Sequence, residues 1–160
     1  MLNPNFRDML VALNDAEADY LVVGAYAMAA HGCPRATGDI DFWIRATLEN
    51  AERVWSALSV FGAPIFQISV GELSTPDVVF QIGVPPQRID IMTSVSGVEF
   101  DEAWPSRFVV DLDGIQASVI GREQLLKNKI ASGRPKDIVD VEILRLDFEW
   151  SRASGRQSVY

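Results

Sequence analysis

The residues best suited to chemistry are two aspartates in the segment Gly38-Asp39-Ile40-Asp41-Phe42 and a third aspartate, Asp90, between two isoleucines. Apolar residues alternate with these aspartates, which is typical of β-strands, where successive side chains point to opposite faces. We therefore expect Asp39 and Asp41 side by side on one face, with Asp90 presented from another strand. Magnesium in proteins is bound by one or two carboxylates together with phosphates, so this pattern indicates a site for a hard divalent cation. Without a cation, clustered carboxylates repel one another, which raises the pKa of at least one of them.

Taken alone, two aspartates at this spacing are also common on solvent-facing strands, and that interpretation stays open. Two other metal patterns are excluded locally. An EF-hand loop beginning at Asp39 needs Asp or Asn at its fifth position and Gly at its sixth, where Trp43 and Ile44 stand. A phosphatase with an aspartate nucleophile, of the haloacid-dehalogenase type, would have Thr or Val in place of Trp43.

The elements that must position these aspartates can be predicted from hydrophobic periodicity and turn residues. Segments with helical spacing or many alanines are expected to be helices: 5–13 with Asn5 as its cap, 25–31, 47–61 with Thr47 as its cap, 122–132 and 136–149. Alternating or fully apolar runs predict strands over 20–23, 39–45, 78–82, 88–93, 108–112 and 115–120. Asp113-Gly114 predicts a hairpin between the last two strands.

This order of elements predicts an α/β (α+β) fold: a mixed β-sheet with flanking helices and a C-terminal helical pair. The helical pair is interrupted at Gly133-Arg134-Pro135, because proline suits the first turn of a helix. We expect a single domain over residues 1–150 and a frayed tail over residues 151–160. His31, directly before Gly32, is expected to satisfy the last carbonyls of its helix.

Composition limits the class of protein. The chain has 160 residues, of which 48% are hydrophobic, and a domain of about this size buries roughly 70% of its unfolded surface. The N-terminus lacks the basic and apolar regions of a signal peptide, and no apolar run approaches the ~20 residues of a membrane-spanning helix. A single cysteine, Cys33, excludes an internal disulfide and a cysteine-based zinc site. We therefore expect a cytoplasmic protein with no membrane partner.

The charge is acidic overall and unevenly distributed. The formal net charge is −8. Residues 1–121 contain six basic and sixteen acidic side chains, whereas residues 122–160 contain eight basic and six acidic ones. Proteins that bind nucleic acid nonspecifically neutralise phosphates with Lys and Arg, so an acidic body predicts no track for duplex DNA. The basic C-terminal region could still attract the phosphates of a small ligand.

The spacing of these features resembles the nucleotidyltransferase signature of the DNA polymerase beta superfamily. In that signature an apolar residue and Gly are followed by Gly or Ser, nine to thirteen residues, D-x-D, and later an acidic residue between apolar ones. Here a strand ends at Gly24, and residues 26–38 separate Ala25 from Asp39. The stretch LVVGAYAMAAHGCPRATGDIDFWI is similar to minimal, AbiEii-like bacterial nucleotidyltransferases, many of them linked to toxin–antitoxin systems. Further resemblance lies in RIDI, VEFDEAW and LLKNKIASGRPKDIVDVEIL, which extends it over nearly the whole chain.

Carried over onto this sequence, the resemblance implies that Asp39, Asp41 and Asp90 are catalytic and hold two magnesium ions. Gly24 matches the glycine at which the backbone approaches a nucleoside triphosphate. Ala25 departs from the signature, because a serine there would donate a hydrogen bond to a phosphate oxygen and alanine cannot. The backbone N–H of Ala25 remains available at the start of the next helix.

Further nucleotide-binding candidates lie in the loop before the D-x-D strand and in the C-terminal region. Arg35 and Thr37 match an R-x-T pattern of the family, and Arg35 could contact phosphate bidentately. A role in stabilising the loop is the alternative for both. Lys129, Asp137 and Asp140 match a C-terminal Lys…[KR]-D-x-x-D pattern of the AbiEii-like group.

Basic residues around Lys129 could form a positive wall facing the triphosphate. Lys136 and Arg134 are the other candidates for this wall. A proline interrupts the helix between them and Lys129, so the three cannot share one helical face, and Lys129 is preferred. For Lys127 we expect a solvated surface position.

The resemblance implies magnesium-dependent transfer of a nucleoside monophosphate from a nucleoside triphosphate to a hydroxyl, with release of pyrophosphate. The expected acceptor is a tRNA-like RNA end or a partner protein. Two hypotheses of other classes stay open. One is a catalytically silent nucleotide- or partner-binding module of a toxin–antitoxin pair, which Ala25 favours. The other is a metal-dependent hydrolase that uses the same carboxylates.

Overall fold

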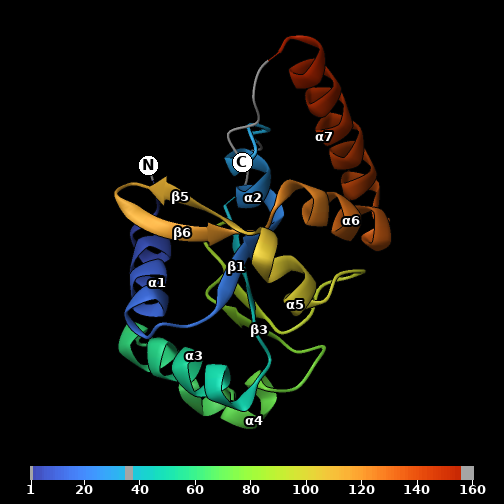
Figure 1. Cartoon of the computed structure of the whole chain (residues 1–160). Coiled ribbons are helices and arrows are strands. Elements are labelled where there is room, and N and C mark those ends of the chain that lie inside the picture. The colour runs from blue at the N-terminus through green and yellow to red at the C-terminus, as the bar shows by residue number, and fades with distance from the viewer. Residues whose placement is uncertain (1, 35–37, 156–160) are drawn as a thin grey trace.

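The computed structural model describes residues 2–34 and 38–155. Within these ranges the strands form one mixed, six-stranded sheet in the order β3-β4-β2-β1-β6-β5 (Figure 1). The strands are β1 (Tyr20–Val23), β2 (Ile40–Ile44), β3 (Val79–Ile82), β4 (Ile89–Met92), β5 (Phe108–Leu112) and β6 (Ile115–Val119). β1 pairs with β6, and β2 with β4, in parallel; the other neighbours are antiparallel. The predicted mixed sheet is confirmed, and every predicted strand is present within one residue of its expected bounds.

The α-helices in the described ranges are α1 (Pro4–Asp15), α2 (Gly24–Ala30), α3 (Leu48–Phe61), α4 (Val70–Leu73), α5 (Phe100–Ala103), α6 (Arg122–Ser132) and α7 (Pro135–Ala153). The prediction that Asn5 caps the first helix is wrong. Asn3 is the cap, and its side chain accepts a hydrogen bond from the Asn5 backbone N–H at 2.8 Å. Pro4 occupies the first turn, where its missing N–H would have no partner within the helix. Thr47 caps α3 as predicted.

The segment between α3 and β3 is more ordered than its Gly-, Ser- and Pro-rich sequence suggests. It contains a 3₁₀ turn, Ile65–Gln67, and the short helix α4. The Ser69 hydroxyl accepts from the Glu72 backbone N–H, and the Glu72 carboxylate accepts from the Ser69 backbone N–H, at 3.1 and 3.2 Å. This reciprocal capping box starts the helix, and buried Leu73 anchors it to the core. A second 3₁₀ turn, Trp104–Ser106, follows α5.

The last helix is longer than predicted. α7 begins at Pro135 and continues to Ala153, so residues 151–153, expected to belong to a frayed tail, are helical. Nothing in this stretch breaks a helix until Gly155, whose φ of 70° lies in the left-handed region. Residues 156–160 lie outside the described residues. None of the helices in the described ranges combines the length and apolar composition that a membrane span needs.

The core holds the strands that carry the aspartates. α1 and α3 pack against each other and against β6 and β2. Ile40, Phe42 and Ile44 of β2 are fully buried, and burial of each such side chain stabilises the fold by about 2 kcal/mol. Because side chains alternate along a strand, Asp39 and Asp41 lie on the opposite face of β2. The apolar residues therefore fix the direction in which the carboxylates point.

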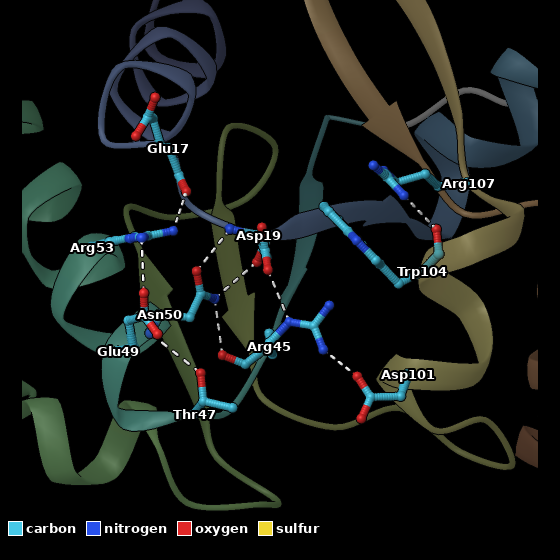
Figure 2. A network of polar contacts seen from close by, with 10 residues as sticks. All are labelled: Glu17, Asp19, Arg45, Thr47, Glu49, Asn50, Arg53, Asp101, Trp104 and Arg107. Carbon is cyan, nitrogen blue, oxygen red and sulfur yellow. Dashed lines mark hydrogen bonds and ion pairs between the residues drawn. The ribbon is translucent and has the colours of Figure 1, made fainter.

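A polar network at the far end of β2 fixes the start of α3 against the start of β1 (Figure 2). The Asn50 side-chain amide donates to the backbone carbonyls of Asp19 and Arg45 at 3.0 and 2.9 Å and accepts from the Asp19 backbone N–H at 2.7 Å. Arg45 also pairs with the carboxylates of Asp19 and Asp101, and its guanidinium lies over the Phe100 ring. This network holds β2 at the end opposite Asp39.

His31 satisfies the last carbonyls of α2 with its backbone N–H, which donates to the Ala27 carbonyl at 3.0 Å, but its side chain has another role. The residue follows α2, but its Nε2 hydrogen-bonds the backbone carbonyl of Ile120, after β6, at 2.8 Å, and its ring packs on Phe108. Burial lowers the pKa of His31, which disfavours the charged form that would interact with the helix dipole. The side chain therefore joins α2 to the β5–β6 hairpin.

Candidate active site

A cavity of about 300 Å³ opens where the end of β1 and the first residues of β2 and β4 face the α6–α7 turn. It brings together seven of the residues predicted to bind metal or nucleotide: Gly24, Ala25, Asp39, Asp41, Asp90, Lys129 and Lys136. Its other lining residues are Arg88, Met92, Arg134, Asp137 and Asp140. The predicted candidates Arg35 and Thr37 lie outside the described residues.

The parallel pairing of β2 with β4 produces the carboxylate cluster. Asp41 and Asp90 are direct partners in this pairing, and Asp39 lies two residues before Asp41. Like charges placed opposite each other on adjacent strands are destabilising. Burial raises the pKa of Asp41 to about 6, with further contributions from the Asp90 charge and hydrogen bond and from Asp39, while Lys136 lowers it. The cavity therefore has an excess of negative charge that a cation would relieve.

Gly24 and Gly38 allow close packing around the aspartates. Gly24 has a φ of 69°, and a Cβ added there would lie 2.3 Å from the Asp41 Oδ2 atom. A Cβ on Gly38 would lie 1.7 Å from the backbone oxygen of Pro86. Glycine is thus required at both positions, because neither approach leaves room for a side chain.

We expect Gly24→Ala to displace the Asp41 carboxylate and to weaken magnesium binding at least about tenfold. The added methyl group would overlap Asp41, and the positive φ would cost about 1 kcal/mol for a residue other than glycine. Isothermal titration with magnesium would measure the loss. Gly62→Ala is a matched control, because Gly62 has a φ of 90° but no atom within 4 Å of its added Cβ. Equal magnesium affinities in the two variants would contradict the prediction.

Arg88 is a site residue that was not predicted. Its guanidinium pairs with both oxygens of the Asp90 carboxylate, at 2.8 and 3.2 Å, and lies 3.5 Å from an Asp39 oxygen. Its backbone N–H donates to Asp39 Oδ1 at 3.1 Å. The available signal was its position two residues before Asp90, which places both side chains on the same face of the strand.

Arg88 also explains a difference from the predicted metal site. In the described ranges, no group of three His, Cys, Asp or Glu side chains has the arrangement needed to hold a metal ion. Asp39, Asp41 and Asp90 share the cavity, but Arg88 pairs with two of these carboxylates, Asp39 and Asp90. Its guanidinium places a positive charge beside them where the prediction placed a metal ion. The three aspartates offer the oxygen ligands that magnesium requires, and Asp90 would exchange its pair with Arg88 for the metal if it bound one.

We expect Arg88→Leu to lower the melting temperature of the metal-free protein, because Asp90 and Asp39 lose the guanidinium that pairs with both of them. Magnesium should raise the melting temperature of this variant more than that of the wild type. Thermal unfolding with and without magnesium would test both points. In Arg53→Leu, which loses only exposed contacts, the pair with Glu49 and a hydrogen bond to the Glu17 carbonyl, little change is expected. Equal responses of Arg88→Leu and the wild type to magnesium would contradict the prediction.

Lys129 lies in a buried ionic cluster. Its ammonium group is 2.7 Å from an Asp140 oxygen and 3.4 Å from an Asp137 oxygen, and all three side chains are almost completely buried. Burial alone would raise the pKa of Asp137, but hydrogen bonds from Ser132 and Arg134 and the charge of Lys129 lower it. The positive charge of Lys129 is therefore balanced within the fold.

The α6–α7 turn corrects the predicted arrangement of basic residues. Lys129, Arg134 and Lys136 were not expected to face one point, yet all three line the same cavity. The chain changes direction at Gly133, whose φ is 63°, and α6 and α7 pack against each other. Lys136 is exposed, and its charge lowers the pKa of Asp41. Because Lys129 is buried and paired, Lys136 is a better candidate than Lys129 for contact with phosphate. Lys127, expected on a solvated surface, pairs with Glu102 at an exposed position.

A second cavity, of about 550 Å³, adjoins the first. The two share Gly24, Asp41, Met92, Lys129, Arg134 and Asp137. The second cavity continues past Asp77, Ser94, Ser96 and Asn128. A molecule bound there would reach the carboxylate cluster from the side of α6.

Solved structures show which fold these elements form. No protein-family model and no curated protein matches the sequence. A protein of Thermotoga maritima, described as a candidate nucleotidyltransferase, is 17% identical over 93% of this chain and 96% of its own, with a TM-score of 0.59. ANT(2'')-Ia, solved with adenylyl-2''-tobramycin, is 14% identical over 94% of this chain and 91% of its own, with a TM-score of 0.61. The chain has a nucleotidyltransferase fold.

The nucleotidyltransferase fold agrees with the predicted fold class and with the superfamily resemblance. Both similarities extend over nearly all of this chain and nearly all of the other one. At identities this low the comparison establishes the fold. The AbiEii-like group, the link to toxin–antitoxin systems and the role of each site residue stay predictions.

Proposed function

We propose that the protein is a magnesium-dependent nucleotidyltransferase that moves a nucleoside monophosphate from a nucleoside triphosphate to a hydroxyl acceptor. The observation that carries this proposal is the meeting of Asp39, Asp41 and Asp90 in one cavity of a nucleotidyltransferase fold. In the reaction, the acceptor oxygen bonds to the α-phosphorus, the bond to the β-phosphate oxygen breaks, and pyrophosphate and the hydroxyl proton leave.

The donor set of the cavity suits magnesium. Asp39, Asp41 and Asp90 would hold two ions. Burial, followed by the charges of Asp90 and Asp39, raises the pKa of Asp41, and bound cations would offset this cost of charging it. When bound, magnesium would neutralise phosphate charge and activate the acceptor hydroxyl. Arg88 balances part of this negative charge in the metal-free protein. If Asp90 bound a metal ion, the Arg88 guanidinium would be available to a phosphate.

The remaining residues of the cavity would position the triphosphate. Gly24 lets the backbone approach it, and Ala25 offers a backbone N–H in place of the usual hydroxyl. Lys136, at the start of α7, supplies an exposed positive charge opposite the carboxylates. Lys129 acts through Asp137 and Asp140, whose positions it fixes.

We propose a discrete acceptor, either a tRNA-like 3′ end or a hydroxyl of a partner protein. The adjoining cavity, with Ser94, Ser96 and Asn128 on its wall, has room for one acceptor end. The acidic body offers no surface for a long nucleic-acid track. ANT(2'')-Ia was solved with an adenylylated small molecule, which supports transfer to a single hydroxyl.

The direct experiment supplies each labelled nucleoside triphosphate with magnesium and, in parallel, tRNA, primed template or cell lysate. Label on one defined acceptor together with pyrophosphate release would support the proposal. Extension of the primed template by many nucleotides would refute the discrete acceptor. Release of free nucleotide without a labelled acceptor would instead identify a metal-dependent hydrolase.

The second candidate is a catalytically silent nucleotide- or partner-binding module of a toxin–antitoxin pair. Ala25 favours it, because the side chain cannot donate to a phosphate, and so does the pairing of Arg88 with Asp90. This candidate would be supported if the protein bound the nucleoside triphosphate but released no pyrophosphate from it in any of the acceptor mixtures. Ala25→Ser should then strengthen nucleotide binding and leave turnover absent.

A further inference from the structure

The sheet ends on one side in a strand whose outer edge is open. β5 is the last strand of the sheet, and among the described strands it pairs with β6 alone (Figure 1). The two-residue turn between β5 and β6 makes Leu112 and Ile115 a hydrogen-bonded pair, and such pairs occur at every second residue of the hairpin. The backbone N–H and C=O groups of Val109 and Asp111 therefore point away from β6.

These outward groups are available to another strand. Within residues 2–34 and 38–155, the N–H and C=O groups of Val109 and Asp111 form no backbone hydrogen bond. The hairpin itself is anchored from the other side, because the Asn14 side chain of α1 donates to the Gln116 carbonyl of β6 at 2.7 Å. A fixed strand with free backbone groups along one edge is a template for pairing with a further strand.

The exposed face of β5 carries two opposite charges on either side of an apolar residue. Val109 is 55% exposed. Arg107 precedes it by two residues and Asp111 follows it by two, so the three side chains share a face. The Arg107 guanidinium lies 3.7 Å from the centre of the Trp104 ring, and the Asp111 carboxylate accepts from the Gly114 N–H at 2.7 Å. Neither charge has an ion-pair partner in the described part of the chain.

An antiparallel pair of two β5 strands matches this pattern. With a two-fold axis at Val109, the outward groups of Val109 bond those of the second copy's Val109, and each Arg107 lies opposite an Asp111. Opposite charges directly across two strands are stabilising, whereas like charges are destabilising. An axis at Val110 would place Val109 opposite Asp111, and an axis at Asp111 would place that carboxylate opposite itself. Of these three registers, the one centred on Val109 pairs charge with opposite charge and apolar with apolar.

We propose that β5 pairs with the β5 strand of a second copy of this chain and joins the two sheets into one. A two-fold contact needs a self-complementary surface, and the order Arg107, Val109, Asp111 provides one. The other edge strand, β3, carries no charged residue over Val79–Ile82. Because the contact is one short strand, the dimer is weak and depends on protein concentration.

The pairing is separate from the proposed catalytic site. Among the described residues, those that line the cavity with the carboxylate cluster do not include any of β5. The strand lies beyond β6 from β1, whereas the aspartates are on β4 and at β2. The proposal therefore stands or fails independently of the proposed activity.

The test is self-association of the full chain, measured by sedimentation equilibrium over a range of protein concentrations. The wild type should pass from monomer to dimer in the micromolar range. Arg107→Glu and Asp111→Lys should each raise the dimer dissociation constant at least about tenfold, because each places like charges opposite each other twice. Arg53→Glu is the control, since it reverses an exposed charge on α3, and it should dimerise like the wild type.

Mixing the two reversed variants separates charge pairing from a loss of structure. Arg107→Glu chains repel one another, as do Asp111→Lys chains, but one copy of each restores two pairs of opposite charge. The mixture should therefore form a heterodimer, and the double variant should form a homodimer, both with nearly the wild-type dissociation constant. Val109→Pro removes an N–H that β6 does not use, so it should weaken the dimer and leave the melting temperature nearly unchanged.

Three results would overturn the proposal. The first is a wild type that remains monomeric at its highest soluble concentration. The second is a dimer that Arg107→Glu, Asp111→Lys and Val109→Pro, each shown to be folded by its melting curve, leave as tight as in the wild type. The third is a mixture of the two reversed variants that associates no better than either variant alone. That result would mean that charge pairing across β5 does not hold the copies together.

Discussion

Replacing Asp41 with asparagine is expected to reduce nucleotidyl transfer about a thousandfold or more while leaving the metal-free fold intact. A metal ligand contributes several kcal/mol of transition-state charge stabilisation, and about 4 kcal/mol corresponds to a factor of about a thousand. Initial rates with a labelled nucleoside triphosphate and saturating magnesium would measure the loss. Asp111→Asn, on the edge strand β5, is a control that changes the same charge outside the cavity.

The metal-free Asp41→Asn variant should be at least as stable as the wild type near pH 7. The pKa of Asp41 is about 6 in the folded protein, against an ordinary value of 3.8 for an exposed aspartate, so the folded state holds this proton more tightly. The wild type therefore loses stability as pH rises from 3.8 through about 6. This pKa difference corresponds to an upper limit of roughly 3 kcal/mol. The stability advantage of the variant should be near zero at pH 4 and grow toward neutral pH.

Urea unfolding of both proteins across this pH range, with EDTA present, would test the sign. A variant that melts well below the wild type at pH 7 would show that Asp41 stabilises the fold. It would also mean that the charged Asp41 carboxylate does not destabilise the metal-free protein, so that the carboxylate cluster would give no reason to expect a cation there.

Replacing Lys129 with methionine is expected to lower the free energy of unfolding by about 3 to 5 kcal/mol. The substitution keeps most of the side-chain volume but leaves Asp137 and Asp140 buried without their shared cation, and breaking a buried pair in this way is strongly destabilising. Urea unfolding followed by circular dichroism would give the value.

Lys127→Met provides the matched control. Lys127 lies two residues away in α6 and pairs with Glu102 where both side chains are exposed, and such pairs contribute about 0 to 1 kcal/mol. If Lys129→Met lost no more stability than Lys127→Met, the buried cluster would have no structural role. Adding Asp140→Asn to Lys129→Met should recover part of the loss, since it removes one of the two buried carboxylates that Lys129 balanced.

The local part of the site could be predicted from the sequence. Alternation of apolar residues with Asp39 and Asp41, and with Asp90, identified both strands and the face that carries the carboxylates. Asp113-Gly114 identified the β5–β6 turn, where both residues have the positive φ, 54° and 85°, that such a hairpin needs. These patterns depend on neighbours within a few residues, so they are readable without the fold.

The parts that could not be predicted depend on residues far apart in the sequence. The ion pair of Arg88 with Asp39 arises from the pairing of β4 with β2. The contact of His31 with Ile120 spans 89 residues. Lys129 reaches Asp140 only because α6 and α7 pack after the turn at Gly133. The same turn places Lys136 in the cavity, which helical periodicity alone argued against.

The position of β1 in the sheet has a consequence for how the chain acquires its structure. β1 lies between β2, which follows soon after it, and β6, which starts at Ile115. The backbone carbonyl of Val22 accepts a hydrogen bond from Ile120, and the Tyr20 hydroxyl reaches the carbonyl of Gln116. One edge of a central strand thus stays unpaired until most of the chain has been synthesised. Such distant pairing slows folding and exposes an unpaired strand edge to self-association in the meantime.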